Sequence, residues 1–284
     1  YRIGFVENTT TIGVSHRRES YDSRRVQRTV RGSIDPLNPG FASVGDLGPF
    51  TGTVDWTINE RGDWTGARYF DADGRPAVHR THGSIGLDVE WDQRGRKVSE
   101  KKVLADGVDA STIRGIEKRW SYDARGNSIA ERYLDHAGRL ERRYHVAAFD
   151  LSYDARDRFV ERRYRNHRDM PTTRQVGSRV ARVVFEYDAA GNYVAERYFD
   201  MEDRPTADAG NNYASVMRDF DATRRIIGYA YLNPEGGPVH DEEFGHTRAA
   251  FTYNAAGLKT EACYVRIEAD ETGALTEHTI TLHR

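Results

Sequence analysis

Alternation of apolar and polar residues is the main pattern along this chain. Before the pair Tyr187-Asp188, for example, Val183 and Phe185 are apolar and Glu186 is polar, and most of the similar pairs elsewhere follow such alternation. A period of two residues is typical of a β-strand that has one face packed and the other in water. The pattern therefore predicts strands, with little or no helix.

The pair of an aromatic residue and an Asp marks the start of a repeat. The aromatic residues of these pairs, called anchors here, are Trp91, Tyr122, Tyr153, Tyr187, Phe220 and, before an Asn, Tyr253; Ile58-Asn59 is a weaker first copy. The spacings are 33, 31, 31, 34, 33 and 33 residues. With the anchor as position 0, Gly recurs at +4, and a second Tyr recurs at +11: Tyr69, Tyr133, Tyr164, Tyr198, Tyr231 and Tyr264. Regular periods of this length indicate a repeat architecture.

Each repeat contains two segments that are typical of turns. The first, Asp-x-x-Gly-Asn, follows the anchor, and Asp caps such turns while Gly accepts a positive φ. A four-residue turn that pairs +1 with +6 would place positions −4, −2, 0, +7 and +11 on one face, which are the apolar positions. On this register, positions +6 and +12 lie on the opposite, polar face. The second segment, Asp-Ala-Asp-Gly-Arg-Pro at 71–76, ends the second strand.

Each repeat is therefore predicted to be an antiparallel β-hairpin with one apolar face and one polar face. A single hairpin is marginally stable in water, so neighbouring hairpins must stack. We predict an all-β fold: an array of about seven hairpins of about 32 residues each, in an elongated or spiralling sheet or solenoid over residues 53–284. The anchors and the Tyr residues at +11 form its repeating core. Residues 1–52 fit the repeat poorly and are predicted to be an N-terminal cap or a degenerate repeat.

Composition narrows the classes of function. The 284 residues include 44 acidic and 42 basic side chains, a formal charge of −2, which argues against binding to a nucleic-acid backbone. The single cysteine, Cys263, excludes an internal disulfide and a multi-cysteine zinc site. No run approaches the roughly 20 apolar residues of a membrane helix. Motifs for a serine nucleophile, a zinc protease or a phosphate loop are absent. We therefore predict a protein that is not an enzyme.

Two rows of side chains are candidates for binding. Position +10 carries Arg68, Arg132, Arg163 and Arg197 on the polar face. They could bind carboxylates or phosphates, although the interleaved Glu residues favour a solvated charged surface. Position +6 carries Trp64 and Tyr193, and position +12 carries Phe70 and Phe199. Exposed rings of this kind stack on sugars or on a partner sheet, unless the sheet buries them by curling or by packing on both faces.

The second turns also carry candidate calcium ligands. Asp71, Asp73, Asp200 and Asp203 supply carboxylate oxygens, and Asp-x-Asp-Gly resembles the opening of a calcium loop. No Glu follows at the bidentate position, and turn capping accounts for the same residues without a metal. We expect no cofactor, with calcium as the weaker alternative.

The sequences Tyr122-Asp-Ala-Arg-Gly-Asn127 and Tyr187-Asp-Ala-Ala-Gly-Asn192 resemble the Tyr-Asp repeats of bacterial Rhs proteins and related toxin shells. The resemblance covers residues 53–265, although here the repeat is longer and has an added turn. It implies an exported, non-catalytic scaffold that binds another protein in a bacterial surface or envelope assembly, in the periplasm, at the cell surface or outside the cell. A glycan-binding array and a shell fragment of an Rhs-type toxin are the alternatives. No export signal or anchor is visible, and we expect any such segment outside these residues.

Overall fold

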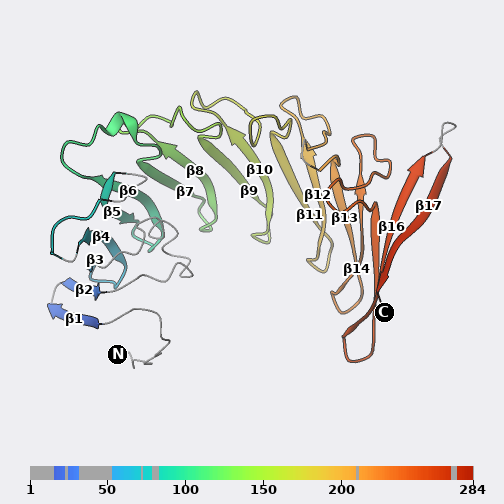
Figure 1. The fold of residues 1–284 in the computed structure, drawn as a ribbon, viewed down its shortest axis with the longest axis horizontal. Coiled ribbons are helices and arrows are strands. Elements are labelled where there is room, and N and C mark those ends of the chain that lie inside the picture. The colour runs from blue at the N-terminus through green and yellow to red at the C-terminus, as the bar shows by residue number, and fades with distance from the viewer. Residues whose placement is uncertain are drawn as a thin grey trace. The chain divides into compact units, whose positions relative to one another are not determined.

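The computed structural model (Figure 1) describes residues 16–22, 25–31, 53–71, 73–78, 83–208, 211–269 and 274–283. The chain divides into two compact units: Tyr1–Trp120 with Tyr133–Arg139, and Ser121–Arg132 with Leu140–Arg284. The described residues form seventeen strands and one short 3-10 turn at Ala110–Thr112, with no α-helix among them. In particular, this part of the chain has no helix long and apolar enough to cross a membrane. The predicted all-β fold class is confirmed.

The strands follow one another along the chain as hairpins. The first unit contains β1 (His16–Asp22), β2 (Arg25–Arg31), β3 (Thr53–Ile58), β4 (Trp64–Phe70), β5 (Ser84–Trp91), β6 (Lys97–Leu104) and most of β7 (Glu117–Tyr122). The second unit contains most of β8 (Ser128–Leu134), then β9 (Ala148–Tyr153), β10 (Phe159–Arg165), β11 (Arg182–Tyr187), β12 (Tyr193–Phe199), β13 (Ser215–Phe220), β14 (Ile226–Leu232), β15 (Arg248–Tyr253), β16 (Lys259–Ala269) and β17 (Leu275–His283). In the second unit, β9 to β17 lie side by side in chain order, each antiparallel to its neighbours (Figure 1).

Six hairpins, from β3–β4 to β15–β16, share one internal register. In β11–β12, Val183 pairs with Tyr198, so position −4 faces +11 as the sequence predicts. Nearer the turn, however, Tyr187 pairs with Tyr193, and a register shift follows before the next pair. The turn is therefore one residue shorter than predicted, and a β-bulge at +7 restores the expected register along the rest of the strand.

The bulge overturns one prediction about the faces. Position +6 was expected on the polar face, but it pairs with the anchor and so lies on the same face as the anchor. The rings of Tyr187 and Tyr193 lie 5.8 Å apart. Position +12 is on the opposite face, where Phe199 pairs with Arg182. We call the face that carries Tyr164, Tyr198 and Tyr231 the aromatic face, and the other the polar face.

The junction between successive hairpins is also constant. In six junctions, three consecutive residues at +8 to +10 pair with positions −3 to −5 of the next hairpin. Beside three of these junctions the residue at −6, which is Ala181, Ala214 or Thr247, links two hairpins through its backbone. The amide of Ala214 donates to the carbonyl of Leu232, and its own carbonyl accepts from the amide of Tyr198, both at 2.8 Å. Five of the six residues at −6 are buried, namely Ile116, Ala147, Ala181, Ala214 and Thr247, whereas Ile85 is partly buried. The role of this position was not predicted from the sequence, although its apolar or small residues were a signal.

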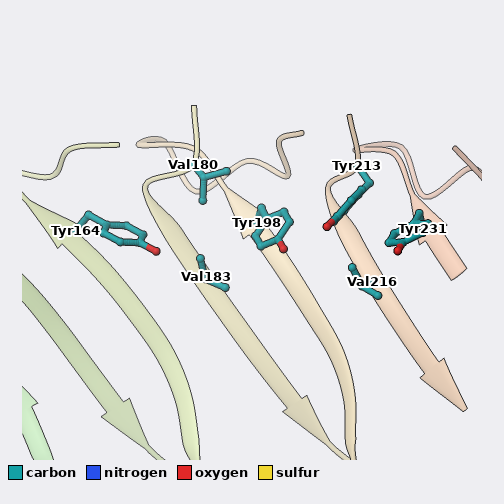
Figure 2. Packing of buried hydrophobic residues seen from close by; sticks show 7 residues of the cluster. All are labelled: Tyr164, Val180, Val183, Tyr198, Tyr213, Val216 and Tyr231. Atoms are coloured by element: carbon teal, nitrogen blue, oxygen red, sulfur yellow. The ribbon is translucent and has the colours of Figure 1, made fainter. Parts of the chain in front are cut away.

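The largest buried cluster lies on the aromatic face of the second unit, near the second turns. It comprises Tyr164, Val180, Val183, Tyr198, Tyr213, Val216 and Tyr231, which follow one another across successive strands (Figure 2). Val180 and Tyr213 come from the connections between hairpins, which the repeat pattern did not single out. The Tyr residues at +11 are buried at 69, 164, 198 and 231 and partly buried at 133 and 264, whereas the anchors are all half-buried.

The segment predicted as an N-terminal cap lies mostly outside the described residues. Within it, β1 pairs with β2 over the length of both strands, and β2 pairs with β3. A hairpin therefore precedes the first recognisable repeat. The assignment of residues 1–52 as a cap stays a prediction.

Candidate binding faces of the hairpin array

The first turns are held by the Asp that follows the anchor. In the β9–β10 turn, one carboxylate oxygen of Asp154 accepts from the backbone amides of Arg156 and Arg158, at 2.8 and 3.0 Å. Its other oxygen accepts from the Arg158 side chain at 2.7 Å. The hydrogen bonds from Arg158 lower the pKa of Asp154 to about 2. Equivalent hydrogen bonds, from Arg96 to Asp92 and from Arg225 to Asp221, hold the pKa values of these two carboxylates below the usual range.

The second turns repeat this chemistry. Asp200 accepts from the amides of Glu202 and Arg204 at 3.0 and 2.9 Å, and Asp71 accepts from those of Asp73 and Arg75 at 2.9 and 2.8 Å. Among the calcium candidates, Asp203 pairs instead with Arg182 and Arg163, and Asp73 pairs with Arg75. Within the described ranges, no three His, Cys, Asp or Glu side chains are grouped so that they could hold a metal. The contacts on these carboxylates are those expected of capped turns.

Adjacent first turns are joined by an Arg at position +3. The Arg61 guanidinium donates to the carbonyl oxygens of Asp92 and Gln93 at 3.0 and 3.1 Å. Arg125 donates to the carbonyl of Asp154 at 2.9 Å, and Arg156 donates to that of Ala189 at 3.0 Å. From the sequence, these Arg residues are expected to lie exposed in loops. In the structure they fix the spacing of successive turns.

The Arg row at +10 lies on the polar face, as predicted, and each guanidinium has a partner within the chain. Arg68 bonds Asp88 Oδ1 at 2.6 Å and the carbonyl of Leu87 at 2.9 Å. Arg132 does the same with Asp150 Oδ1 at 2.6 Å and the carbonyl of Phe149 at 2.7 Å. Each side chain therefore bridges its hairpin to the first strand of the next.

The other two members of the row pair with Glu residues. Arg163 bonds Glu161 at 2.7 Å, and Arg197 bonds Glu186 at 2.7 Å. Burial alone would raise the pKa of Asp150, but hydrogen bonds from Arg132 and Arg165 outweigh it and lower that pKa. This arrangement supports the interpretation of the row as a self-satisfied charged surface. Binding of an external carboxylate or phosphate by these four residues stays a prediction.

The charged row is interrupted at the junction of β14 and β15. Ala230 stands at +10, where four of the other hairpins carry Arg and one carries Lys101, and Ala250 stands opposite the small Gly228. An open hollow of about 490 Å³ lies here, bordered by Asp219 and Arg248. The Arg248 guanidinium pairs with Glu277 of β17 at 2.6 Å. The neutral Cys263 continues this gap, because it pairs with Ala250.

A row of half-buried rings lies on the aromatic face of the second unit, at the first-turn end of the strands. We call Tyr153, Phe159, Phe185, Tyr187 and Tyr193 the tip row. Ring centroids from Tyr153 to Phe159, Phe159 to Phe185 and Phe185 to Tyr193 lie 5.6, 4.8 and 5.8 Å apart. Tyr193, a predicted binding residue, is thus a member of a continuous aromatic surface and not an isolated exposed ring.

Cationic and acidic groups surround the tip row. The guanidinium of Arg218 lies 4.3 Å from the centre of the Tyr193 ring, and that of Arg158 lies 4.7 Å from the Tyr187 ring. Glu196 accepts hydrogen bonds from the hydroxyls of Tyr193 at 2.6 Å and Tyr198 at 3.0 Å. Burial, together with the Glu196 carboxylate, raises the pKa of the Tyr193 hydroxyl. The tip row therefore presents neutral phenols and positive charge together.

The remaining predicted ring positions lie elsewhere. Trp64 is half-buried in the first unit, where its carbonyl accepts from the indole of Trp91 at 2.7 Å. Phe199 lies on the polar face of the second unit, with the guanidinium of Arg182 at 4.0 Å from its ring centre. Phe70 forms a bridge with Pro76 at the second turn. Only Tyr193 among these residues joins the tip row.

Comparison with known proteins gives fold-level likeness at most. No family model matches the chain, and no curated protein matches it. A chain of the Photorhabdus luminescens Tc holotoxin pore structure is 11% identical, with 92% of this chain and 16% of that chain covered and a TM-score of 0.31. A chain of the TcdB2-TccC3 crystal structure is 12% identical, with 90% and 14% covered and a TM-score of 0.30. This chain spans less than a fifth of the length of those chains.

Proposed function

We propose that this chain is a non-catalytic scaffold that binds another protein through its aromatic face, as part of an exported bacterial surface or envelope assembly. The tip row is the observation that carries the proposal. Tyr, Phe and Arg are enriched in the centres of protein interfaces, where rings bury large areas at low entropic cost. Here Phe159, Phe185 and Tyr193 are only partly covered, and Arg158 and Arg218 lie over neighbouring rings.

The tip row is also held in place before any partner arrives. The turns beside it are capped by Asp154 and Asp188 and joined by Arg156. The hydroxyl of Tyr187 reaches the preceding hairpin. A surface whose side chains are already ordered loses less conformational entropy on binding, which favours recognition of a folded partner.

Site-specific photocrosslinking tests this proposal. Benzoylphenylalanine placed at Phe159 should crosslink one protein partner in stoichiometric amount in the native host, whereas the same group at Phe199, on the polar face, should not. Equal crosslinking from both sites would contradict a specific role for the aromatic face. Crosslinks only to another segment of the same polypeptide would favour the toxin-shell alternative.

The glycan alternative predicts a different outcome. A sugar bound by the tip row should raise the melting temperature of the purified chain, and Phe185→Ser should abolish that rise. A glycan screen without any thermal shift, together with a protein crosslink at Phe159, would support the scaffold and count against the glycan alternative.

A further inference from the structure

The aromatic face of the second unit carries an excess of positive charge. Among the strand positions from −4 to +11 of the hairpins β9–β10 to β15–β16, the charged residues on this face are Arg162, Arg218, Lys259 and Glu196. Most of the other positions on this face hold aromatic or aliphatic side chains. Three cations therefore accompany one carboxylate, although the formal charge of the whole chain is −2.

Two of these cations contact rings and form no ion pair with a described carboxylate. The guanidinium of Arg162 lies 5.5 Å from the centre of the Phe159 ring and 5.8 Å from that of Phe149. The ammonium of Lys259 lies 3.8 Å from the centre of the Phe251 ring. A ring attracts a cation through its electron-rich face but does not neutralise the charge. Both charges therefore remain for a partner to meet.

The single carboxylate is already engaged. Glu196 accepts hydrogen bonds from the hydroxyls of Tyr193 and Tyr198 at 2.6 and 3.0 Å. Its distance to the Arg218 guanidinium is 3.8 Å, which is longer than a hydrogen bond. Arg218 is therefore only partly neutralised.

The polar face of the same hairpins is different, because each of its Arg residues pairs with a carboxylate of the chain. These residues are Arg163, Arg165, Arg182, Arg197 and Arg248. The excess charge is thus a property of the aromatic face and not of the sheet as a whole.

The cations of the aromatic face are also far apart. Arg162 pairs with Val183, Val183 pairs with Tyr198, and the amide of Tyr198 donates to the carbonyl of Ala214, so these residues share one level across the sheet. Arg218 is four residues beyond Ala214, about 13 Å along an extended strand. Strands β10 and β13 are three steps apart in the sheet, about 14 Å. One carboxylate cannot meet both guanidinium groups.

We propose that the aromatic face binds an acidic segment of a partner protein, in which apolar side chains pack on the rings and at least two carboxylates pair with Arg162 and Arg218. This inference rests on the proposed scaffold function and names the chemistry of the partner. A guanidinium that lies over a ring keeps the N–H groups of its edge, and these fit a carboxylate. Three cations spread over eight strands are too sparse for a polyanion, whereas the many rings favour apolar contacts.

The experiment uses the full chain and two labelled synthetic peptides in fluorescence anisotropy. The acidic peptide is Asp-Leu-Asp-Phe-Gly-Asp-Leu-Asp-Phe, and its matched control carries Lys in place of every Asp. The acidic peptide should bind at least about ten times more tightly in about 50 mM sodium chloride, and added salt should weaken it. A heparin fragment, the polyanion probe, should compete poorly with the acidic peptide.

Variants assign the binding to this face. Arg162→Gln and Lys259→Gln should each weaken binding of the acidic peptide about threefold to tenfold, since each removes one charge pair. Neither change removes an ion pair within the described chain, so the melting temperature should stay the same. Lys101→Gln is the matched control, because Lys101 is exposed at +10 on the polar face of the first unit. It should leave the affinity unchanged.

Equal affinity for the two peptides, or no binding of the acidic peptide at millimolar concentration, would overturn the proposal. So would an unchanged affinity in Arg162→Gln. Tighter binding of the heparin fragment that depends on Arg162 would assign the face to a polyanion, and this would also overturn it. A protein crosslinked at Phe159 together with equal affinity for the two peptides would keep the scaffold function and reject only its acidic partner.

Discussion

The hydroxyl of Tyr187 donates a hydrogen bond to the carbonyl oxygen of Phe159 in the preceding hairpin, at 3.0 Å. Strands β10 and β11 pair only from Glu161 to Arg163, so the backbone pairing has ended before this point. The anchor side chain thus connects the two hairpins where the strands no longer do. Trp91 and Tyr253 make the same contact with the carbonyls of Trp64 and Ile226. This contact accounts for the ring with a hydrogen-bond donor that stands at most of the anchor positions.

Removing that donor should weaken the contact between hairpins. Tyr187→Phe is expected to cost about 1 kcal/mol, the usual contribution of one hydrogen bond, while the ring packing stays. Phe220 is an aromatic anchor without a hydrogen-bond donor, so Phe220→Tyr is the matched reverse change and should not destabilise. Urea denaturation of both variants measures the effect. A Tyr187→Phe variant as stable as the parent would show that the contact contributes nothing.

The second Tyr of each repeat, and not the anchor, should contribute most to stability. Tyr198 is 4% exposed, whereas Tyr187 is half-buried. Tyr198→Ala should therefore cost about 3 to 5 kcal/mol, as for other buried aromatic residues, and Tyr187→Ala about 1 to 2 kcal/mol. Native-state hydrogen exchange of the β12 amides measures both, because it does not require all hairpins to unfold together. Equal losses in the two variants would contradict this ranking.

Stability should fall in acid as the turn carboxylates take up protons. The hydrogen bonds from Arg158 lower the pKa of Asp154 to about 2, against about 3.9 in an unfolded chain. Because the folded pKa is the lower one, the contribution is complete above pH 4 and is lost between about pH 4 and pH 2. The pKa values of Asp92, Asp188 and Asp221 are lowered as well.

The variant Asp154→Asn separates charge from turn geometry, since Asn keeps the oxygen acceptor and stands naturally at 59 and 254. It should lower stability at pH 7 and make the urea midpoint less dependent on pH between 5 and 2.5. Asp219→Asn, at an exposed carboxylate on the polar face, is the control and should leave the pH dependence as it is. Identical slopes for parent and Asp154→Asn would refute the assignment.

The Arg row should contribute to stability through specific partners. Arg132 and Asp150 are both partly buried and bond at 2.6 Å, with a second bond to the carbonyl of Phe149. A double-mutant cycle of Arg132→Ala and Asp150→Ala should give a coupling energy of about 1 kcal/mol. Arg132→Lys should lose most of this coupling energy, because a lysine ammonium cannot bond Asp150 Oδ1 and the Phe149 carbonyl oxygen together as the planar guanidinium does. A coupling energy near zero would contradict this pairing and would leave Arg132 available to bind an external ligand.

Much of the fold followed from periodicity, because a half-buried strand must alternate and a hairpin turn needs Asp and Gly. The pairing of Val183 with Tyr198 was predictable from these rules alone. Asp157 and Arg224, which break the Gly pattern at +4, adopt the same positive φ, 59° and 67°. Their side chains compensate by bonding the neighbouring turn at Asn127 and Asn192. The turn geometry therefore tolerates the exceptions that the sequence contains.

The candidate site was less predictable. A bulge adds one residue to one strand, and one residue reverses every side chain beyond it, so the face of Tyr193 could not be derived from alternation. The burial of Ala181 and Ala214 depends on backbone hydrogen bonds to two different hairpins. Such bonds leave no pattern in the sequence except the small size of the side chain.

By itself, the sequence determined the repeat, the strand class, the capped turns and the register far from the turn, because each depends on residues close together in the chain. Only the tertiary structure decided which rings form a continuous surface and which guanidinium meets which carboxylate. Those features depend on the approach of neighbouring hairpins, where a bulge, a three-residue junction and an anchor hydroxyl combine. Residues about thirty positions apart then become neighbours, and no local pattern records which atoms meet.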